Sequence, residues 1–311
     1  MDDDTVVFGA SGFLGRHLLA AAAAAGMRPR AVTRRPAAAA WLANADWQRG
    51  DLADPSSLRG LLRVGDTVVN LAYSPDATAA ENLAAADHLL AACRQAGVRR
   101  IVHCSTAVVA GATAVQRVDE TVACRPKMPY ERSKWAIEER IAAAAGPGLS
   151  VAILRPTAIV GPGGANLAKL ASDLLRGTTI ANYCRRSLFG TRPMHLVPVS
   201  TVAAALLHLA CLPEPGPAET FIVAADDDAD NSFPAVERIL RAALGLPAAR
   251  VPALPVPRVL LSLALRLRGR SDAAHDRFYS CDKLRRTGFA ATPTVAEAVR
   301  DFGTWFRTSR A

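Results

Sequence analysis

The stretch Thr5-Val6-Val7-Phe8-Gly9-Ala10-Ser11-Gly12-Phe13-Leu14-Gly15 decides the fold of this 311-residue chain. Its apolar, β-branched first half predicts a buried strand over Thr5–Ala10, and Gly12–Ala25 predicts a helix that begins directly afterwards. Three glycines at the spacing G-x-x-G-x-x-G join the two. Glycine lets the backbone turn tightly and approach a pyrophosphate, while the free N–H groups at a helix start attract the anion. We therefore expect a dinucleotide site rather than a plain flexible turn. The residues expected to contact the dinucleotide are Gly9, Ser11, Gly12, Phe13, Leu14 and Gly15.

Strand-like and helix-like stretches alternate along the first half of the chain. Further strands are predicted over residues 30–33, 67–72, 100–105 and 151–155, and further helices over 77–96 and 130–145. Strands with nearly continuous apolar character suit a parallel sheet that is buried on both faces. The repeated strand–helix–strand units therefore predict an α/β fold with a doubly wound parallel sheet, the Rossmann architecture.

The alternation loosens after Gly161–Gly164, where proline becomes frequent and the strand candidates shrink. We therefore divide the chain into an NAD(P)-binding domain over 1–165 and a mainly substrate-binding region over 166–311. Segments near 194–225 are expected to return to the first domain. The second region is expected to be a smaller appended part without an independent core. Its segment 257–270, with arginines among leucines, is interpreted as a helix of this region rather than as an interfacial membrane helix.

The composition argues against several classes of protein. The formal net charge is +9, but 33 of the 37 basic residues are arginines spread along the chain and aromatic residues make up only 5%. A nucleic-acid-binding surface would gather its charge together with aromatic side chains, so no nucleic-acid partner is expected. The apolar runs are too short for a membrane span, the N-terminus is acidic, and the six cysteines are scattered, so a cytoplasmic location is expected. The histidines show no metal-ligand spacing, and the acidic run at 226–230 is interpreted as a solvated loop.

Two arginines follow the second predicted strand. An enzyme that prefers NAD usually carries an acidic residue there, which binds the ribose 2′-hydroxyl. The sequence has no acidic residue between Thr5 and Ala45. Arg34 and Arg35 instead supply two cations where the 2′-phosphate of NADP would lie. We therefore predict NADP(H) over NAD(H); the alternative is that both arginines simply point into solvent.

Tyr130 and Lys134 form the candidate catalytic pair, because the spacing i and i+4 places them one turn apart on one face of a helix. A nearby cation favours the phenolate, so the pKa of Tyr130 is expected to lie below the usual value of about 10. The phenol would then serve as a general acid or base. Ser105 and Thr106 stand at the end of a predicted strand, at the edge where open α/β sheets bind ligands. A hydroxyl there can hydrogen-bond a carbonyl oxygen as negative charge develops on it.

Together these motifs resemble the extended short-chain dehydrogenase/reductase family, also called the NAD-dependent epimerase/dehydratase family. The resemblance runs nearly end to end, through the glycine loop, residues 50–52, 69–72, Asn82, 103–106, Tyr130 with Lys134, 154–163 and 283–289. It implies that Asp51 and Leu52 flank the adenine, that Lys134 holds the nicotinamide ribose and that Tyr130 transfers the proton. It places the active hydroxyl at Thr106, with Ser105 beside it. Ala72 and Pro156 complete the expected cofactor-binding residues.

Departures from the family pattern narrow the predicted activity. Sugar-nucleotide dehydratases carry Asp-Glu after the active threonine, whereas Ala107 and Val108 follow Thr106 here, and Ala158 replaces an asparagine common in sugar-nucleotide members. We therefore predict an oxidoreductase that transfers hydride between NADP(H) and a carbonyl or secondary alcohol carbon of a small molecule, with Tyr130 as acid/base. The alternatives are a nucleotide-sugar epimerase with retained NAD and a non-catalytic dinucleotide-sensing protein. The resemblance also implies a homodimer, formed through the helices predicted at 77–96 and 130–145.

Overall fold

A computed structural model describes residues 4–35, 45–111, 113, 115–213, 216, 218–249, 254 and 277–309. The arginine-rich segment 257–270 lies outside the described residues, so its predicted helix is not placed. Within the described ranges, no helix combines the length and the apolar character that crossing a bilayer requires.

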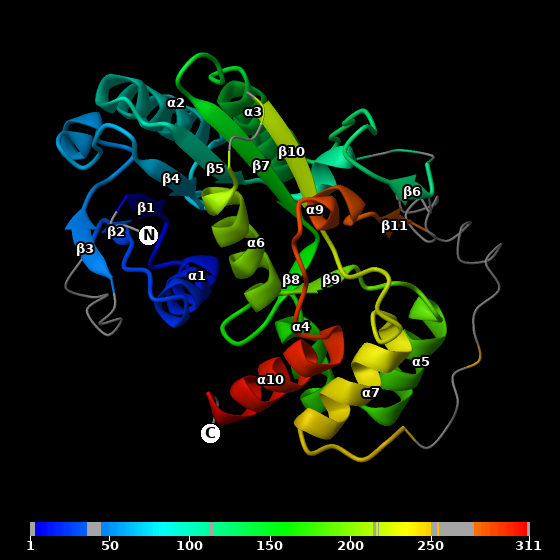
Figure 1. Ribbon diagram of the computed structural model, residues 1–311. Coiled ribbons are helices and arrows are strands. Elements are labelled where there is room, and N and C mark those ends of the chain that lie inside the picture. Colours follow the sequence, from blue (N-terminus) through cyan, green and yellow to red (C-terminus); the bar gives the residue numbers. More distant parts are fainter. Residues whose placement is uncertain are drawn as a thin grey trace.

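A seven-stranded parallel sheet forms the centre of the molecule (Figure 1). Its strands are β1 (Thr5–Phe8), β2 (Arg30–Thr33), β3 (Asp46–Arg49), β4 (Thr67–Asn70), β5 (Arg100–Cys104), β7 (Ser150–Pro156) and β10 (Ala218–Val223). From one edge to the other their order is β10-β7-β5-β4-β1-β2-β3. The chain thus runs outward in opposite directions from β1 and β4, which leaves a crevice for a ligand beyond the carboxyl ends of these two strands. The predicted doubly wound sheet is confirmed.

Helices cover both faces of this sheet, and the alternation of side chains along each strand explains why. Val7 of β1 points to the face covered by α1 (Phe13–Ala24) and α6 (Val199–Cys211), where it joins a cluster with Leu18 and Leu206. The neighbouring Val6 points to the opposite face, where it packs with Leu89 of α2 (Ala79–Ala96) and a second helix, α3 (Pro129–Ala142). Every residue of β1, β2 and β4 is therefore buried on one face or the other, which produces the continuous apolar runs, whereas no residue of the edge strand β3 is fully buried.

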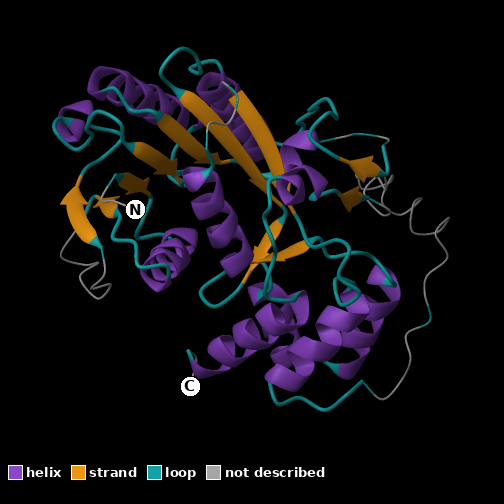
Figure 2. Ribbon diagram, in the orientation of Figure 1, coloured by secondary structure: helices purple, strands orange, loops and turns teal. Residues whose placement is uncertain are grey.

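The C-terminal part of the chain has a hydrophobic cluster of its own. It consists of two short paired strands, β8 (Ala158–Val160) and β9 (Leu196–Pro198), and the helices α4 (Ala168–Arg176), α5 (Thr179–Phe189), α7 (Phe233–Ala243) and α10 (Val295–Thr308). Leu167, Leu240 and Phe302 are buried in this cluster, which is distinct from the two clusters on the sheet. The sequence predicted a smaller appended part without an independent core, and the structure shows a separate hydrophobic cluster there, which also includes Val160 from before residue 166. The strand β7 points toward this group of helices (Figure 2).

Several short elements complete the fold. The strands β6 (Arg117–Val118) and β11 (Phe278–Tyr279) pair with each other, although about 160 residues separate them along the chain. Two 3-10 helices, η2 (Pro55–Leu58) and η3 (Ala107–Ala110), follow the carboxyl ends of β3 and β5. A short helix, α9 (Asp282–Arg286), packs near β10.

Candidate active site

The glycine loop lies tightly against the end of β4, as its predicted role requires. Gly9 has a positive φ of 79°, and a Cβ atom added to it would lie 2.9 Å from the carbonyl carbon of Leu71. A Cβ atom on Gly15 would lie 2.4 Å from the carbonyl oxygen of Gly9. The helix α1 begins after Gly12, and no side chain caps its first N–H groups. The loop thus leaves an uncapped helix N-terminus close to the crevice at the middle of the sheet.

The end of β2 is joined to this loop by a hydrogen bond between hydroxyl groups. Thr33 Oγ1 donates to Ser11 Oγ at 3.2 Å, and the backbone N–H of Arg35 donates to Thr33 Oγ1 at 3.4 Å. Arg34 and Arg35 are both exposed. Thr33 also accepts the backbone N–H of Gly50 at 3.1 Å, which brings the end of β3 to the same edge. The two arginines therefore begin one residue beyond a contact with the phosphate loop.

The other predicted cofactor residues lie at the same edge of the sheet. Asp51 follows β3, and its carboxylate accepts the backbone N–H of Ala53 at 3.0 Å. His88 of α2 donates to the carbonyl of Leu52 at 2.7 Å, which fixes this segment to the helix. The backbone N–H of Ala72 donates to Asn70 Oδ1 at 3.0 Å, so the turn after β4 is also held in place.

Lys134 is buried beside the carboxyl end of β5. Its side chain lies on α3, is only 4% exposed, and donates from Nζ to the carbonyl oxygen of Cys104 at 2.8 Å. The ammonium also lies 5.3 Å from the ring centre of Tyr73. Burial lowers the pKa of Lys134, while the charges of Cys104 and Glu138 oppose this shift. A buried ammonium fixed at this edge can hold hydroxyl groups of a ribose.

Tyr130 stands one helical turn before Lys134 and is 47% exposed. Its ring packs edge to face on Tyr73, with 5.4 Å between the ring centres. Exclusion of water by the surrounding protein raises the pKa of Tyr130, the neighbouring Cys104 and Tyr73 raise it further, and interaction with the Thr106 side chain lowers it. The expectation of a lowered pKa is therefore wrong for this structure. The physical reason is that the ammonium of Lys134 is directed to the carbonyl of Cys104 rather than to the phenol.

Ser105 and Thr106 lie where β5 ends. The backbone N–H of Ser105 donates to the carbonyl of Leu154 at 2.8 Å, while its Oγ atom is buried and has no hydrogen-bond partner in the described part of the chain. Thr106 caps η3 and is half-buried. Pro156 ends the neighbouring strand β7. A buried hydroxyl without a partner is costly, so a ligand atom that bonds Ser105 would satisfy it.

A buried ion pair joins β7 to α3, the helix that carries Tyr130 and Lys134. Arg155 of β7 donates through Nε to both carboxylate oxygens of Glu138 on α3, at 3.0 and 3.2 Å. Because Glu138 stands one turn after Lys134, the pair fixes the helix that carries both predicted catalytic side chains. The spacing of these residues in the sequence gave no indication of this contact.

The structure thus brings all the predicted site residues to the carboxyl edge of the parallel strands, as a dinucleotide-binding Rossmann protein requires. A model of the NAD dependent epimerase/dehydratase family matches residues 5–223. The chain belongs to this family.

Curated relatives cover a smaller part of the chain. A 4-hydroxy-2-methyl-3-oxo-4-farnesyl-3,4-dihydroquinoline-1-oxide ketoreductase from Stigmatella aurantiaca is 35% identical over 168 residues, 50% of this chain and 50% of that protein. The chain therefore matches about half the length of this relative.

Solved structures resemble the whole chain. RMD from Pseudomonas aeruginosa, complexed with NADPH, superposes with a TM-score of 0.69 at 22% identity and covers 98% of this chain and 99% of its own. The Bordetella bronchiseptica enzyme WbmH, in complex with NAD+, superposes with a TM-score of 0.72 at 17% identity, with 98% of both chains covered. At these identities the two structures support the fold.

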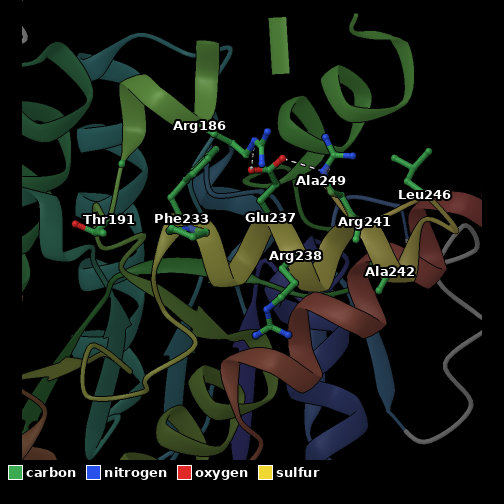
Figure 3. A pocket seen from close by; sticks show the side chains of 12 residues that line it. Arg186, Thr191, Phe233, Glu237, Arg238, Arg241, Ala242, Leu246 and Ala249 are labelled. Atoms are coloured by element: carbon green, nitrogen blue, oxygen red, sulfur yellow. Dashed lines mark hydrogen bonds and ion pairs between the residues drawn. The ribbon is translucent and has the colours of Figure 1, made fainter. Parts of the chain in front are cut away.

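A cavity of about 490 Å³ lies apart from these residues, between α5, α7 and the segment that follows α7. Figure 3 shows Glu237 between Arg186 and Arg241, with its carboxylate 2.9 Å from Arg241 Nε and 3.9 Å from Arg186 Nε. None of the predicted catalytic or cofactor-binding residues lines this cavity.

The acidic run at 226–230 is only in part the solvated loop that was expected, because Asp227 and Asp230 keep exposed side chains while Asp226 is buried. The side chain of Asp226 is 2% exposed and lies 2.7 Å from Nδ1 of His195. Asp227 pairs with Arg285, and Asp228 accepts the backbone N–H of Val295. Sequence reasoning missed these contacts because their partners lie 31 to 67 residues away along the chain.

Proposed function

We propose that this chain is an NADP(H)-dependent oxidoreductase that reduces a carbonyl group of a small molecule, or oxidises the corresponding secondary alcohol. The observation that carries the proposal is the set of polar groups at the end of β5. An accessible phenol, a buried ammonium and an unpartnered buried hydroxyl, from Tyr130, Lys134 and Ser105, gather there beside the glycine loop. Similarity to a ketoreductase over half of the chain also supports the proposal.

The residues present fit a dinucleotide. The loop contains glycines at Gly9 and Gly15, where a Cβ atom would meet backbone atoms within 3.0 Å, so these positions are built for close approach of main chain. The uncapped start of α1 and the absence of an acidic residue from its first turn leave the N–H groups for a pyrophosphate. When bound, a nicotinamide dinucleotide supplies or accepts the hydride.

In the proposed reduction, each side chain has one task. Tyr130 donates a proton from its hydroxyl to the carbonyl oxygen, and its raised pKa keeps the phenol in the protonated form that this step needs. Thr106 and Ser105 donate hydrogen bonds to the same oxygen and hold it beside the phenol. Lys134 holds the ribose, and Arg155 and Glu138 act as positioning residues for α3.

The preference for NADP(H) rests on the end of β2. Arg34 and Arg35 are exposed directly beyond the contact between Thr33 and Ser11, and they follow the strand after which a ribose-binding residue is expected in this fold. Replacing both arginines by alanine is expected to weaken binding of NADPH by about 10- to 100-fold, since two charge-assisted hydrogen bonds are lost. Binding of NADH should change little. Titration of nicotinamide fluorescence with both cofactors measures this preference.

The experiment that tests the reaction compares the wild-type protein with Tyr130→Phe. NADPH oxidation is followed with ethyl acetoacetate and with other ketones as probes. Phenylalanine preserves the ring contact with Tyr73 but lacks the acid, so turnover should fall by about 100- to 10,000-fold while NADPH binding stays unchanged. Full turnover by the variant would show that Tyr130 is not the proton donor.

The same purified protein discriminates between the proposed reductase and a nucleotide-sugar epimerase. An epimerase returns the hydride to its substrate, so it would carry tightly held NAD and show no net change in nicotinamide absorbance during turnover. The reductase would be purified without cofactor and consume NADPH in proportion to the ketone. We also propose that the region 166–311 supplies most of the substrate contacts, because its own cluster packs beyond the end of β7.

A further inference from the structure

His195 has an unusual backbone conformation, which its neighbours enforce. Its φ is 51°, the left-handed region, and within the described ranges no other residue except glycine has a positive φ. Asn231, which is buried, accepts the backbone N–H of Met194 through its carbonyl and that of Leu196 through Oδ1, at 3.0 and 2.9 Å. Conformations of this kind persist where the surroundings impose them, and they concentrate at functional sites.

The imidazole of His195 is oriented by a buried carboxylate. Nδ1 lies 2.7 Å from Oδ2 of Asp226, which also accepts the backbone N–H of Tyr279 at 2.8 Å. The ring packs edge to face on Tyr279, with 5.2 Å between the ring centres. A carboxylate oxygen that accepts this hydrogen bond takes it from Nδ1, which leaves Nε2 as the second polar atom of the ring. The histidine side chain is 21% exposed, whereas Asp226 is 2% exposed.

Two contacts connect this group to η3, which follows Thr106, and to the segment after β7. Tyr279 is buried in a cluster with Ala107 and Ala110 of η3, the turn that follows Thr106 directly. The carbonyl oxygen of His195 accepts the backbone N–H of Ala158 at 2.8 Å, two residues beyond the end of β7.

We propose that His195 is a substrate-binding residue, whose imidazole, oriented by Asp226, hydrogen-bonds a second oxygen of the ketone substrate. The inference rests on the proposed function, because it assigns the substrate class of that same site. A histidine with a purely structural role could be buried completely. Here Nδ1 is bonded to the carboxylate of Asp226, while the side chain of His195 remains 21% exposed. Its left-handed backbone is held by the hydrogen bonds of Asn231 to the residues on either side, as is common at functional sites. The substrate class is therefore a ketone that carries a further carbonyl or hydroxyl oxygen near the reacting carbon.

Two ketones of equal chain length test this inference. Ethyl acetoacetate carries a second carbonyl oxygen, while 2-heptanone has methylene groups in place of the ester. The variant His195→Asn suits the test because asparagine tolerates a positive φ and can still donate to Asp226, but it does not reach the position of Nε2. Its KM for ethyl acetoacetate should rise by about 3- to 10-fold, the size of one lost hydrogen bond, while kcat and the KM for 2-heptanone stay within about two-fold.

Two further variants separate binding from folding. His208→Asn is the matched control. His208 lies on α6, forms a hydrogen bond with the hydroxyl of Thr287 at 2.7 Å, and is not part of the proposed site. It should leave both ketones unaffected. His195→Gln returns an amide to the position of Nε2 and should recover part of the preference for ethyl acetoacetate. NADPH binding and the melting temperature, measured for every variant, report whether the fold is intact.

The outcomes distinguish this inference from the proposed function. If His195→Asn lowers turnover of both ketones equally, or changes neither, the inference is overturned while the reductase function stands. If His195→Asn loses NADPH binding or unfolds, the histidine has a structural role, and the inference is overturned as well. If the wild-type protein reduces no ketone with NADPH, the proposed function fails and this inference fails with it.

Discussion

Gly15 offers the sharpest test of how the sequence builds the cofactor site. Replacing it by alanine adds one Cβ atom, which would lie 2.4 Å from the carbonyl oxygen of Gly9 and 2.5 Å from that of Ala10. Both neighbours are backbone atoms, so no side chain can rotate away. Because real Cβ atoms essentially never approach other atoms within 3.0 Å, helix and loop must separate by at least roughly 0.6 Å.

The magnitude of the effect follows from this displacement. Overpacking of a tight contact costs about 1–3 kcal/mol of folding free energy. Since each 1 kcal/mol shifts the melting temperature of a chain of this size by roughly 2–4 °C, Gly15→Ala should melt several degrees below wild type. The displaced helix start also loses at least one charge-assisted hydrogen bond to the pyrophosphate. NADPH binding should therefore weaken by about 10- to 100-fold.

The assay combines thermal melting with titration of NADPH fluorescence, and Gly146→Ala serves as control. Gly146 follows α3 with no positive φ, and an added Cβ atom would meet nothing within 4 Å. The control variant should match wild type in both measurements. If Gly15→Ala bound NADPH as tightly as the control and melted at the same temperature, the role assigned to the close approach of the loop would be refuted.

Three further predictions concern individual groups in and around the site. Arg155→Met leaves the carboxylate of Glu138 buried without its partner, so chemical denaturation at neutral pH should show a loss of about 3–5 kcal/mol; a loss below about 1 kcal/mol would contradict a buried pair. Burial raises the pKa of the Cys104 thiol to about 11, so maleimide should label the exposed Cys184 first, and peptide mapping that finds early label on Cys104 would disagree. Because the pKa of Tyr130 is raised above 10, the acid form persists at high pH and kcat/KM for ketone reduction should decline only above about pH 10; a decline centred below pH 9 would count against Tyr130 as the acid.

Features encoded by contiguous residues could be predicted from the sequence. The strand predicted over 67–72 is β4 at Thr67–Asn70, and the helix predicted over Gly12–Ala25 is α1 at Phe13–Ala24. The continuous apolar runs and the glycine spacing each lie within a short stretch of sequence. They can therefore be recognised without knowledge of the fold. The sequence also predicted at which edge of the sheet the polar residues gather, because parallel strands share one carboxyl edge.

A lowered pKa was expected for Tyr130, and this was wrong because residue spacing does not determine where a lysine ammonium lies. The separation of four residues puts Lys134 on the same helix face, but a lysine side chain is long, and tertiary packing decides where its ammonium ends. Here the carbonyl of Cys104, which belongs to β5, receives that ammonium at 2.8 Å. Water exclusion then dominates at the phenol and raises the pKa instead.

The same argument explains why His195 and Asp226 could not be found in the sequence. A histidine before a short strand and an acidic run in a loop carry no mutual signal, and their contact spans 31 residues. It forms because β9 pairs with β8 and the chain after β10 returns to the same place, where Asn231 fixes the strained backbone. The motifs that carry the family resemblance each lie within a short stretch of sequence, so they can be recognised without the fold. The proposed substrate contact depends on residues from separate segments of the chain, so the folded structure is needed to find it.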